Sequence, residues 1–412
     1  MSHILFAGIN YWPELSGISP YTTGLAEYLA NCGHRVTVIT GFPHYPSWSV
    51  DPAYRGELRR KETIAGVEVI RRRHYVPSHQ SVVGRGLYEV TFFAHGLLSR
   101  PDPPDVVIGV TPSLSGGALA RIFAARWHVP YGLIVQDLMG RAAKQSGMAA
   151  GGLVAGGVSR LEAWTVGRAR AVGVVSPSFV PYLRSLGVRS SRIVDLPNWN
   201  VRPAVAASAA ETRERLGWGQ NHIVLHAGNM GLKQGLEQVL EAARISAMSE
   251  PLIRFVLLGD GNQRAQLQRA ATGLANVQFL PSQSDDDYAA ALAAADVLLL
   301  CQRASVADMS LPSKLTSYCA AGRPIVAAVR GDGATYREIQ RTGAALAVPA
   351  GDPEALLDAI TCLRDDPAES ARLGAAGASY AATALGSTEG LERGRKFVEG
   401  LLAPASPREP AR

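Results

Sequence analysis

Apolar and polar positions alternate in blocks along this chain. Short apolar runs, long enough for buried strands, are separated by longer stretches in which apolar residues recur at helical spacing. Strands buried on both faces read as continuous apolar runs, so this order predicts an α/β fold with parallel sheets covered by helices. The expected strands of the first half are residues 4–9, 36–40, 105–110, 131–136 and 171–176.

Helical patterns fill the gaps between these strands. The expected helices are residues 17–31, 85–98, 114–127 and 153–168. Residues 57–72 look instead like an antiparallel excursion that turns at Ala65 and Gly66.

The pattern breaks at residues 198–210, where Pro203 and a stretch rich in Ala and Ser predict a linker. The chain then continues with strands at residues 222–227, 253–258, 277–280, 296–300, 325–329 and 345–348, and with closing helices at residues 353–364, 367–382 and 389–402. We therefore expect one domain at residues 1–200, a second at 201–385, and a final helix and tail at 386–412.

The composition is that of a globular chain, with 47% hydrophobic and 18% charged residues. Four widely spaced cysteines predict buried thiols in a reducing compartment rather than disulfides or zinc ligands. The N-terminus lacks a basic region, its apolar run is too short for a signal peptide, and no stretch reaches the length of a membrane-spanning helix. The expected location is the cytoplasm.

Charge is distributed unevenly. Residues 1–200 carry 20 Lys and Arg against 12 Asp and Glu, whereas the remainder is slightly acidic. The basic runs at residues 59–61 and 71–73 could face a membrane surface or an anionic acceptor, or form a solvated hairpin. The helix at residues 85–98 could lie on a membrane or be buried in the core. Peripheral contact at the inner membrane face through the first domain is therefore one alternative. Nucleic acid is disfavoured, because no aromatic–basic interleaving or known binding motif is present.

Lys314 follows Ser313 at the predicted start of a helix that lies between two strands. Free N–H groups, a hydroxyl and a cation at one helix start suit a phosphate, although an ordinary capped helix has the same pattern. A glycine-rich loop with Gly228, Gly235 and Lys233 follows the strand at residues 222–227 and suits a diphosphate. Gly259 lies in a turn that either flanks a nucleotide or is a plain turn.

Two loops of the first half also follow predicted strands. Gly17 opens a helix and lets backbone approach a ligand, but the loop lacks the GxGxxG fingerprint of dinucleotide sites. Gln136 and Asp137 end the strand at residues 131–136. Asp137 there suits a catalytic or substrate-binding role, or a helix cap.

Taken together, these loops resemble glycosyltransferase family four, and within it the bacterial exopolysaccharide (colanic-acid-type) transferases. The resemblance covers nearly the whole chain. The segments that carry it are Tyr11-Trp-Pro-Glu-Leu-Ser-Gly17, Gln136-Asp-Leu138, Leu196-Pro-Asn-Trp199, Gly228-Asn-Met-Gly-Leu-Lys-Gln-Gly235, Pro312-Ser-Lys314 and Gly322-Arg-Pro324.

The resemblance implies a GT-B fold, in which two doubly wound Rossmann-like domains face a central cleft. It also implies a retaining, metal-independent hexosyltransferase without a resident cofactor. A UDP-, GDP- or dTDP-sugar would bind the second domain, and an acceptor hydroxyl on a glycan, lipid-linked sugar or small metabolite would face the first. The final helix would cross back to the first domain.

Site residues carried over from the resemblance fall into two groups. The expected catalytic residues are Gln136, Asp137, Lys233 and Lys314. The expected donor-binding residues are Gly17, Gly228, Asn229, Gln234, Gly235, Gly259, Leu311, Pro312, Ser313 and Ser317.

Some positions depart from the family pattern. Many members carry Arg and Lys where this chain has Asn229 and Gln234, and a pair of Glu where it has Met309 and Ser317. A frequent His is replaced by Gln136. Two alternatives stay open at this point. One is a non-catalytic nucleotide-sugar-binding partner, which loss of the Glu pair favours. The other is a sugar-nucleotide epimerase, which would need acid/base carboxylates in the cleft.

Overall fold

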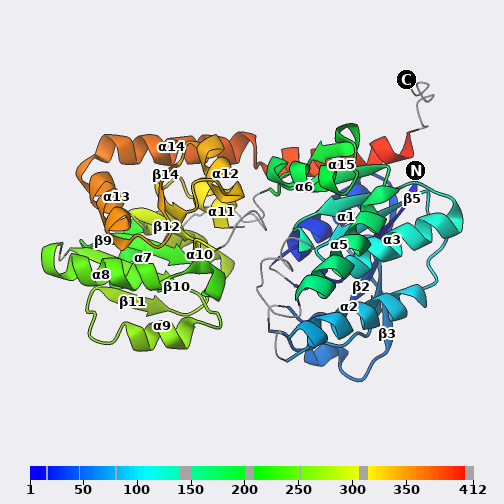
Figure 1. The fold of residues 1–412 in the computed structure, drawn as a ribbon, viewed down its shortest axis with the longest axis horizontal. Coiled ribbons are helices and arrows are strands. Elements are labelled where there is room, and N and C mark those ends of the chain that lie inside the picture. Colours follow the sequence, from blue (N-terminus) through cyan, green and yellow to red (C-terminus); the bar gives the residue numbers. More distant parts are fainter. Residues whose placement is uncertain are drawn as a thin grey trace. The chain divides into compact units, whose positions relative to one another are not determined.

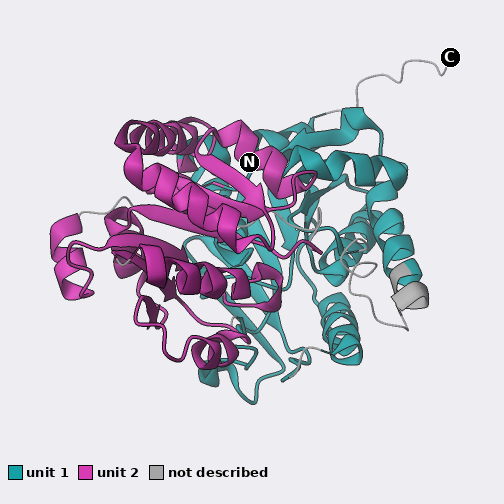
Figure 2. Ribbon diagram, turned by 60° about the vertical axis from the view of Figure 1, so that its left-hand side comes forward, with its two compact units in different colours: residues 1–198, 388–412 teal, residues 199–387 magenta. Residues whose placement is uncertain are grey.

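A computed structural model describes residues 1–14, 17–45, 47–78, 81–139, 151–199, 208–250, 252–305 and 314–403. The chain forms two compact units (Figure 2). Unit 1 comprises Met1–Asn198 and Thr388–Arg412, and unit 2 comprises Trp199–Ser387. Each unit is built around its own sheet, and Figure 1 labels many of the elements.

Unit 1 contains an eight-stranded sheet with the order β3-β4-β2-β1-β5-β6-β7-β8. Its strands are β1 (His3–Ala7), β2 (Arg35–Gly41), β3 (Arg59–Ile64), β4 (Val67–Arg72), β5 (Val106–Thr111), β6 (Tyr131–Val135), β7 (Ala171–Val174) and β8 (Ile193–Asp195). Only the edge pair β3–β4 is antiparallel among the described strands. It turns at Ala65 and Gly66, whose φ angles are both positive, as a two-residue hairpin requires. The predicted excursion is thereby confirmed.

The helices of unit 1 are α1 (Ser19–Asn31), α2 (Val82–Leu97), α3 (Leu114–Trp127), α5 (Gly151–Gly167), α6 (Val180–Ser185) and α15 (Ser387–Leu402). The last of these, red in Figure 1, belongs to unit 1 although it ends the described chain. Its Phe397 packs on the sheet where β6 has Gly132, since a Cβ there would lie 2.9 Å from the ring. Tyr28 of α1 donates a hydrogen bond of 3.1 Å to Glu392.

Unit 2 contains a six-stranded, wholly parallel sheet with the order β11-β10-β9-β12-β13-β14. Its strands are β9 (His222–Ala227), β10 (Ile253–Leu258), β11 (Val277–Leu280), β12 (Val297–Cys301), β13 (Ile325–Val329) and β14 (Ala345–Pro349). Its helices are α7 (Ala209–Arg215), α8 (Glu237–Ser249), α9 (Arg264–Ala270), α10 (Asp285–Ala294), α11 (Lys314–Ala320), α12 (Ala334–Thr342), α13 (Pro353–Asp365) and α14 (Pro367–Thr383). Two apolar clusters, one that includes Trp218 and one that includes Phe255, form its core.

Parallel α/β sheets were predicted from the apolar runs and are confirmed, with every predicted strand overlapping an observed one. The short strand β8 was not predicted, because three residues with two exposed positions leave no apolar run. The four cysteines are free, but Cys32 and Cys362 are exposed, so the prediction of four buried thiols was wrong for these two. Cys32 follows the last residue of α1 and Cys362 lies on the outer side of α13, where a lone apolar residue needs no burial. Within the described part of the chain, no helix has both the length and the apolar content to cross a membrane.

Candidate functional site

The strand order of unit 2 marks a crevice. β9 lies between β10 and β12, so the loops that leave the carboxyl ends of β9 and β12 diverge from each other. In open parallel sheets this divergence is where ligands bind. The loop after β9 begins at Gly228, and α11, which follows β12 in the described chain, begins at Lys314.

Lys314 and His226 meet at this crevice. The Lys314 Nζ lies 2.9 Å from Nε2 of His226, a fully buried residue of β9. The ammonium also packs against Gly228, where a Cβ would lie 3.7 Å from Nζ. Gly228 has a φ of +120°, a conformation that side chains rarely adopt, so glycine is the residue that fits beside the ammonium.

Burial controls the charge of this pair. It lowers the pKa of Lys314 to about 7, although the nearby Cys301 opposes the change. Burial, and then the Lys314 charge, hold the pKa of His226 well below its usual range. His226 is therefore neutral and accepts a hydrogen bond from Lys314. Among the described residues no carboxylate forms an ion pair with Lys314, so an anion would supply the missing countercharge.

The glycine-rich loop is fastened to the neighbouring loop after β10. The N–H of Gly228 donates to the Leu258 carbonyl at 2.8 Å, and that of Met230 donates to Asp260 at 2.7 Å. Gly259 lies so close that a Cβ would be 2.1 Å from the Gly228 oxygen. These backbone contacts fix the floor of the crevice, and the N–H groups that make them already have acceptors inside the unit.

The other predicted donor-loop residues lie in and beside the short helix at Leu232–Gln234. Gln234 accepts a hydrogen bond from the Gly231 N–H at 3.1 Å. Lys233 is exposed, and its carbonyl accepts from the Arg303 N–H at 2.9 Å. Gly235 has a φ of +58° and packs directly on Arg303, which forms an ion pair with Glu237. Sequence reasoning missed Arg303, because its contact with the loop depends on the β9–β12 pairing.

Asn229 and Ser317 complete the described part of the site. The Asn229 Oδ1 approaches Gly261, where a Cβ would lie 2.6 Å away. Ser317 donates to the Lys314 carbonyl at 3.0 Å and lies 3.3 Å from the Tyr288 hydroxyl. The predicted residues Leu311, Pro312 and Ser313, and the departure at Met309, lie outside the described residues.

Unit 1 gathers its predicted residues at the carboxyl ends of its strands. The buried Gln136 and the half-buried Asn198 exchange two amide hydrogen bonds, of 3.0 and 2.8 Å, which join the end of β6 to the segment after β8. Asp137 is partly exposed. The pKa of Tyr45 is raised by burial first and then by the negative charges of Glu14 and Asp137, so the phenol lies within electrostatic reach of Asp137.

Gly17 lies on the same side of unit 1. Its φ is +69°, and a Cβ there would lie 3.2 Å from the Tyr45 ring. The buried Glu14 carboxylate holds the loop with Tyr45, since it accepts hydrogen bonds from the N–H groups of His44 at 2.8 Å and Tyr45 at 2.9 Å. Glu14, His44 and Tyr45 were not predicted. Glu14 belongs to a segment that carried the family resemblance, but the sequence offers no signal for its partners.

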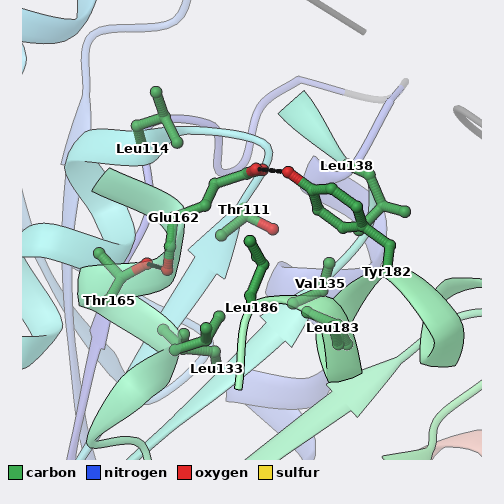
Figure 3. A pocket seen from close by; sticks show the side chains of 11 residues that line it. Thr111, Leu114, Leu133, Val135, Leu138, Glu162, Thr165, Tyr182, Leu183 and Leu186 are labelled. Atoms are coloured by element: carbon green, nitrogen blue, oxygen red, sulfur yellow. Dashed lines mark hydrogen bonds between the residues drawn. The ribbon is translucent and has the colours of Figure 1, made fainter. Parts of the chain in front are cut away.

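A small cavity lies beneath the end of β6 (Figure 3). It is mostly apolar, and Glu162 accepts a hydrogen bond of 2.6 Å from Tyr182 at its wall. Glu162 also accepts from the N–H of Met139 at 2.8 Å. With a volume of about 20 Å³ it has room for one water and not for a sugar. Glu162 at its wall instead holds the backbone that follows Asp137, through the Met139 N–H.

The chain matches family models along most of its length. A model described as "Glycosyl transferase 4-like domain" matches residues 16–199, and one described as "Glycosyl transferases group 1" matches residues 221–366. These two matches divide between the two units.

Two curated proteins and one solved structure illustrate the similarity. The chain is 36% identical to the putative colanic acid biosynthesis glycosyl transferase WcaI of Escherichia coli K12, over 77% of this chain and 81% of that protein. It is 27% identical to a GDP-mannose-dependent monoacylated alpha-(1-6)-phosphatidylinositol monomannoside mannosyltransferase of Corynebacterium glutamicum, over 43% of this chain and 47% of that protein. The structure of Anabaena Alr3699/HepE in complex with UDP superposes with a TM-score of 0.71 at 14% identity, covering 97% of this chain and 100% of the other. At that identity the likeness shows the fold alone.

Proposed function

This chain belongs to glycosyltransferase family four, with a GT-B fold, and we propose that it is a retaining, metal-independent hexosyltransferase. Its donor is a UDP-, GDP- or dTDP-sugar, and its acceptor is a hydroxyl group of a glycan, a lipid-linked sugar or a small metabolite. The acceptor oxygen bonds to the anomeric carbon on the face from which the diphosphate leaves. The proton of the hydroxyl passes to the departing phosphate oxygen.

The observation that carries this proposal is the position of Lys314. Its ammonium lies at the β9–β12 crevice, held by neutral His226 and packed on Gly228, without a carboxylate partner among the described residues. Negative charge develops on the diphosphate as the glycosyl bond breaks. A fixed cation in a water-poor site stabilises that charge more than it stabilises the bound donor.

The remaining residues of unit 2 take supporting roles in this proposal. Lys233 supplies a second, mobile cation from the exposed side of the loop. Gly228, Gly235 and Gly259 let backbone approach the nucleotide, while Asn229, Gln234 and Ser317 offer polar side chains. Leu311, Pro312 and Ser313 would hold the phosphate beside Lys314.

The residues of unit 1 act toward the sugar and the acceptor. Asp137 is the partly exposed carboxylate at the end of β6, and it would accept hydrogen bonds from sugar hydroxyls. Gln136 is tied to Asn198 and would fix the backbone that carries Asp137. Gly17 would let the loop after β1 approach the donor phosphate.

The names of the relatives favour an acceptor that is a glycan or a lipid-linked sugar. The E. coli relative is named for colanic acid biosynthesis, and the Corynebacterium relative is named for transfer to a phosphatidylinositol mannoside. An acceptor of this kind would place the reaction in the cytoplasm, at the inner face of the membrane.

Calorimetry with UDP, GDP and dTDP on the wild type and on Lys314→Met tests the phosphate site. We expect one nucleotide to bind the wild type, and Lys314→Met to lower both its affinity and the transfer rate, the latter by about 10²–10³-fold as for loss of one oxyanion donor. Lys396→Met, an exposed lysine of α15, is the control.

Turnover with the matching nucleotide sugar tests the reaction itself. Activity that survives EDTA and yields a product with the donor's anomeric configuration is the expected result. Binding without any turnover across donors and acceptors would replace the transferase with a nucleotide-sugar-binding partner. Equal nucleotide affinity of Lys314→Met and wild type would remove the proposed site.

A further inference from the structure

Helix α2 of unit 1 exposes an apolar stripe. The stripe consists of Val83, Leu87, Val90, Ala94 and Leu98, spaced by three or four residues and so aligned along one side of the helix and its C-terminal end. Val83 is 73% exposed, Val90 62% and Leu98 65%. The opposite side of α2 packs into the core through Tyr88 and Phe92, so the helix is buried on one face and exposes apolar residues on the other.

A basic pocket adjoins the stripe. It is an open concavity of about 690 Å³ lined by Arg59, Arg60, Lys61, Ile70, Arg72, Leu98 and Arg100. Leu98 belongs to both features, so the apolar stripe and the basic pocket form one continuous surface. Figure 1 labels α2, which carries most of the stripe, and the edge strand β3, which carries Arg59, Arg60 and Lys61 of the pocket.

The basic pocket contains more positive charge than its neighbours balance. Arg59 lies directly opposite Arg72 in the β3–β4 ladder, a like-charge pair that by itself destabilises the sheet. Nearby carboxylates are already engaged, Glu57 with Arg60 and Glu68 with Lys61. In the described chain, Arg59, Arg72 and Arg100 have no ion pair. Burial, and then Arg59, lower the pKa of Arg72.

We propose that the apolar stripe and the basic pocket together dock this protein on an anionic membrane surface. The stripe enters the boundary between headgroups and acyl chains, and the arginines of the pocket contact lipid phosphates. An apolar helix face beside a cluster of unpaired cations is the combination that binds such a surface in plane. The exposed residues of α2 include no carboxylate that would be repelled.

This inference does not depend on the proposed transfer reaction, because vesicle binding can be measured without a donor or an acceptor. Sedimentation of the full chain with phosphatidylcholine vesicles, with and without phosphatidylglycerol, is the assay. We expect binding to the anionic vesicles, weakened by added salt, and little binding to the neutral ones.

Two pairs of variants separate the contributions. Leu87→Ser with Val90→Ser should weaken vesicle binding by more than about tenfold through lost apolar burial. Arg59→Gln with Arg100→Gln should weaken it by roughly fivefold per arginine. The matched controls in unit 2 and α15 are Met248→Ser with Leu252→Ser, and Arg269→Gln with Lys396→Gln, all at exposed positions.

An unchanged circular dichroism spectrum and thermal unfolding transition of each variant, measured on the full chain, shows that unit 1 is folded, so that a loss of vesicle binding supports the docking surface. The inference is overturned if the wild type ignores anionic vesicles. It is also overturned if the stripe and pocket variants bind them as tightly as the controls do. A wild-type protein that binds anionic vesicles but transfers no sugar would contradict the proposed function and leave this surface standing.

Discussion

Lys314 shows how a single buried residue prepares a site for an anion. Its hydrogen bond to neutral His226 orients the ammonium but supplies no negative charge. In the free protein the desolvation free energy of the buried ammonium is therefore not offset by an anion. For this reason the pKa of Lys314 falls to about 7. A bound diphosphate would remove the cost and raise the pKa again.

Nucleotide-sugar binding should consequently take up a proton above about pH 7. The free lysine is then mostly neutral while the bound lysine is charged, so affinity should fall by up to about tenfold per pH unit as pH rises from about 7. Calorimetry in buffers of different ionisation enthalpy measures the proton, with UDP-glucose as a probe whose diphosphate does not titrate there. Lys314→Met should abolish the pH dependence, and a flat affinity in the wild type would contradict the lysine's role.

The lowered pKa of Lys314 also makes the stability of the free protein depend on pH. Between about pH 7 and the usual lysine pKa of 10.5, the unfolded chain binds a proton that the folded chain does not. Stability should therefore rise with pH through this window as far as Lys314 contributes, opposite to the trend in affinity.

At the scale of elements, the site depends on two loops that dock through their backbones. The loops after β9 and β10 touch at Gly228 and Gly259, and Gly259 has a φ of +129°. Because the contact is backbone against backbone, no side-chain rotation can make room for a larger residue. The position of Gly228, and with it the wall beside Lys314, is thus set by the neighbouring loop.

Gly259→Ala should lower the free energy of unfolding by about 1–3 kcal/mol and weaken nucleotide binding as well. The new Cβ would lie 2.1 Å from the Gly228 oxygen and would displace that loop. Gly331→Ala is the matched control, since its Cβ meets nothing within 4 Å. Denaturant titration of both variants is the measurement, and equal stability would show that the loops do not depend on this contact.

At the scale of the whole molecule, unit 1 is not continuous in sequence. The chain leaves it at Asn198 and returns at Thr388, and α15 then covers the sheet with Phe397 and Leu401 beside Gly132. Without α15, this face of β6 and β7 would be exposed to water. Gly132 in the sheet leaves the space that Phe397 and Leu401 of α15 fill, so the core of unit 1 is complete only when this last helix is docked.

A fragment of residues 1–198 alone should therefore be unstable or aggregate, whereas residues 199–387 should fold alone. Joining residues 388–403 to the first fragment through a flexible linker should restore a cooperative unfolding transition. Circular dichroism and thermal unfolding of the three proteins provide the comparison. Equal stability of the first fragment with and without α15 would show that this helix is dispensable.

The sequence by itself determined the α/β architecture, because fully buried parallel strands leave short apolar runs and these alternate along the chain with stretches of helical spacing. It also placed Gly228 and Gly259 in loops at strand ends and Lys314 at the start of a helix, and the family resemblance followed from the order of these segments. The hairpin that turns at Ala65 and Gly66 could also be predicted, because its signal is local: two short strands joined by a two-residue turn.

Only the tertiary structure decided which side chains meet. The partnership of Lys314 with His226 joins residues 88 positions apart, and that of Gln136 with Asn198 joins residues 62 apart. Neither strand order nor burial can be read from local spacing. The sequence therefore did not predict His226, Arg303, or Glu14 with its partners His44 and Tyr45. The two faces of α2 show the same division. The sequence supplied the apolar residues, whereas the packing of Tyr88 and Phe92 on the sheet decided which ones remain exposed beside the arginines.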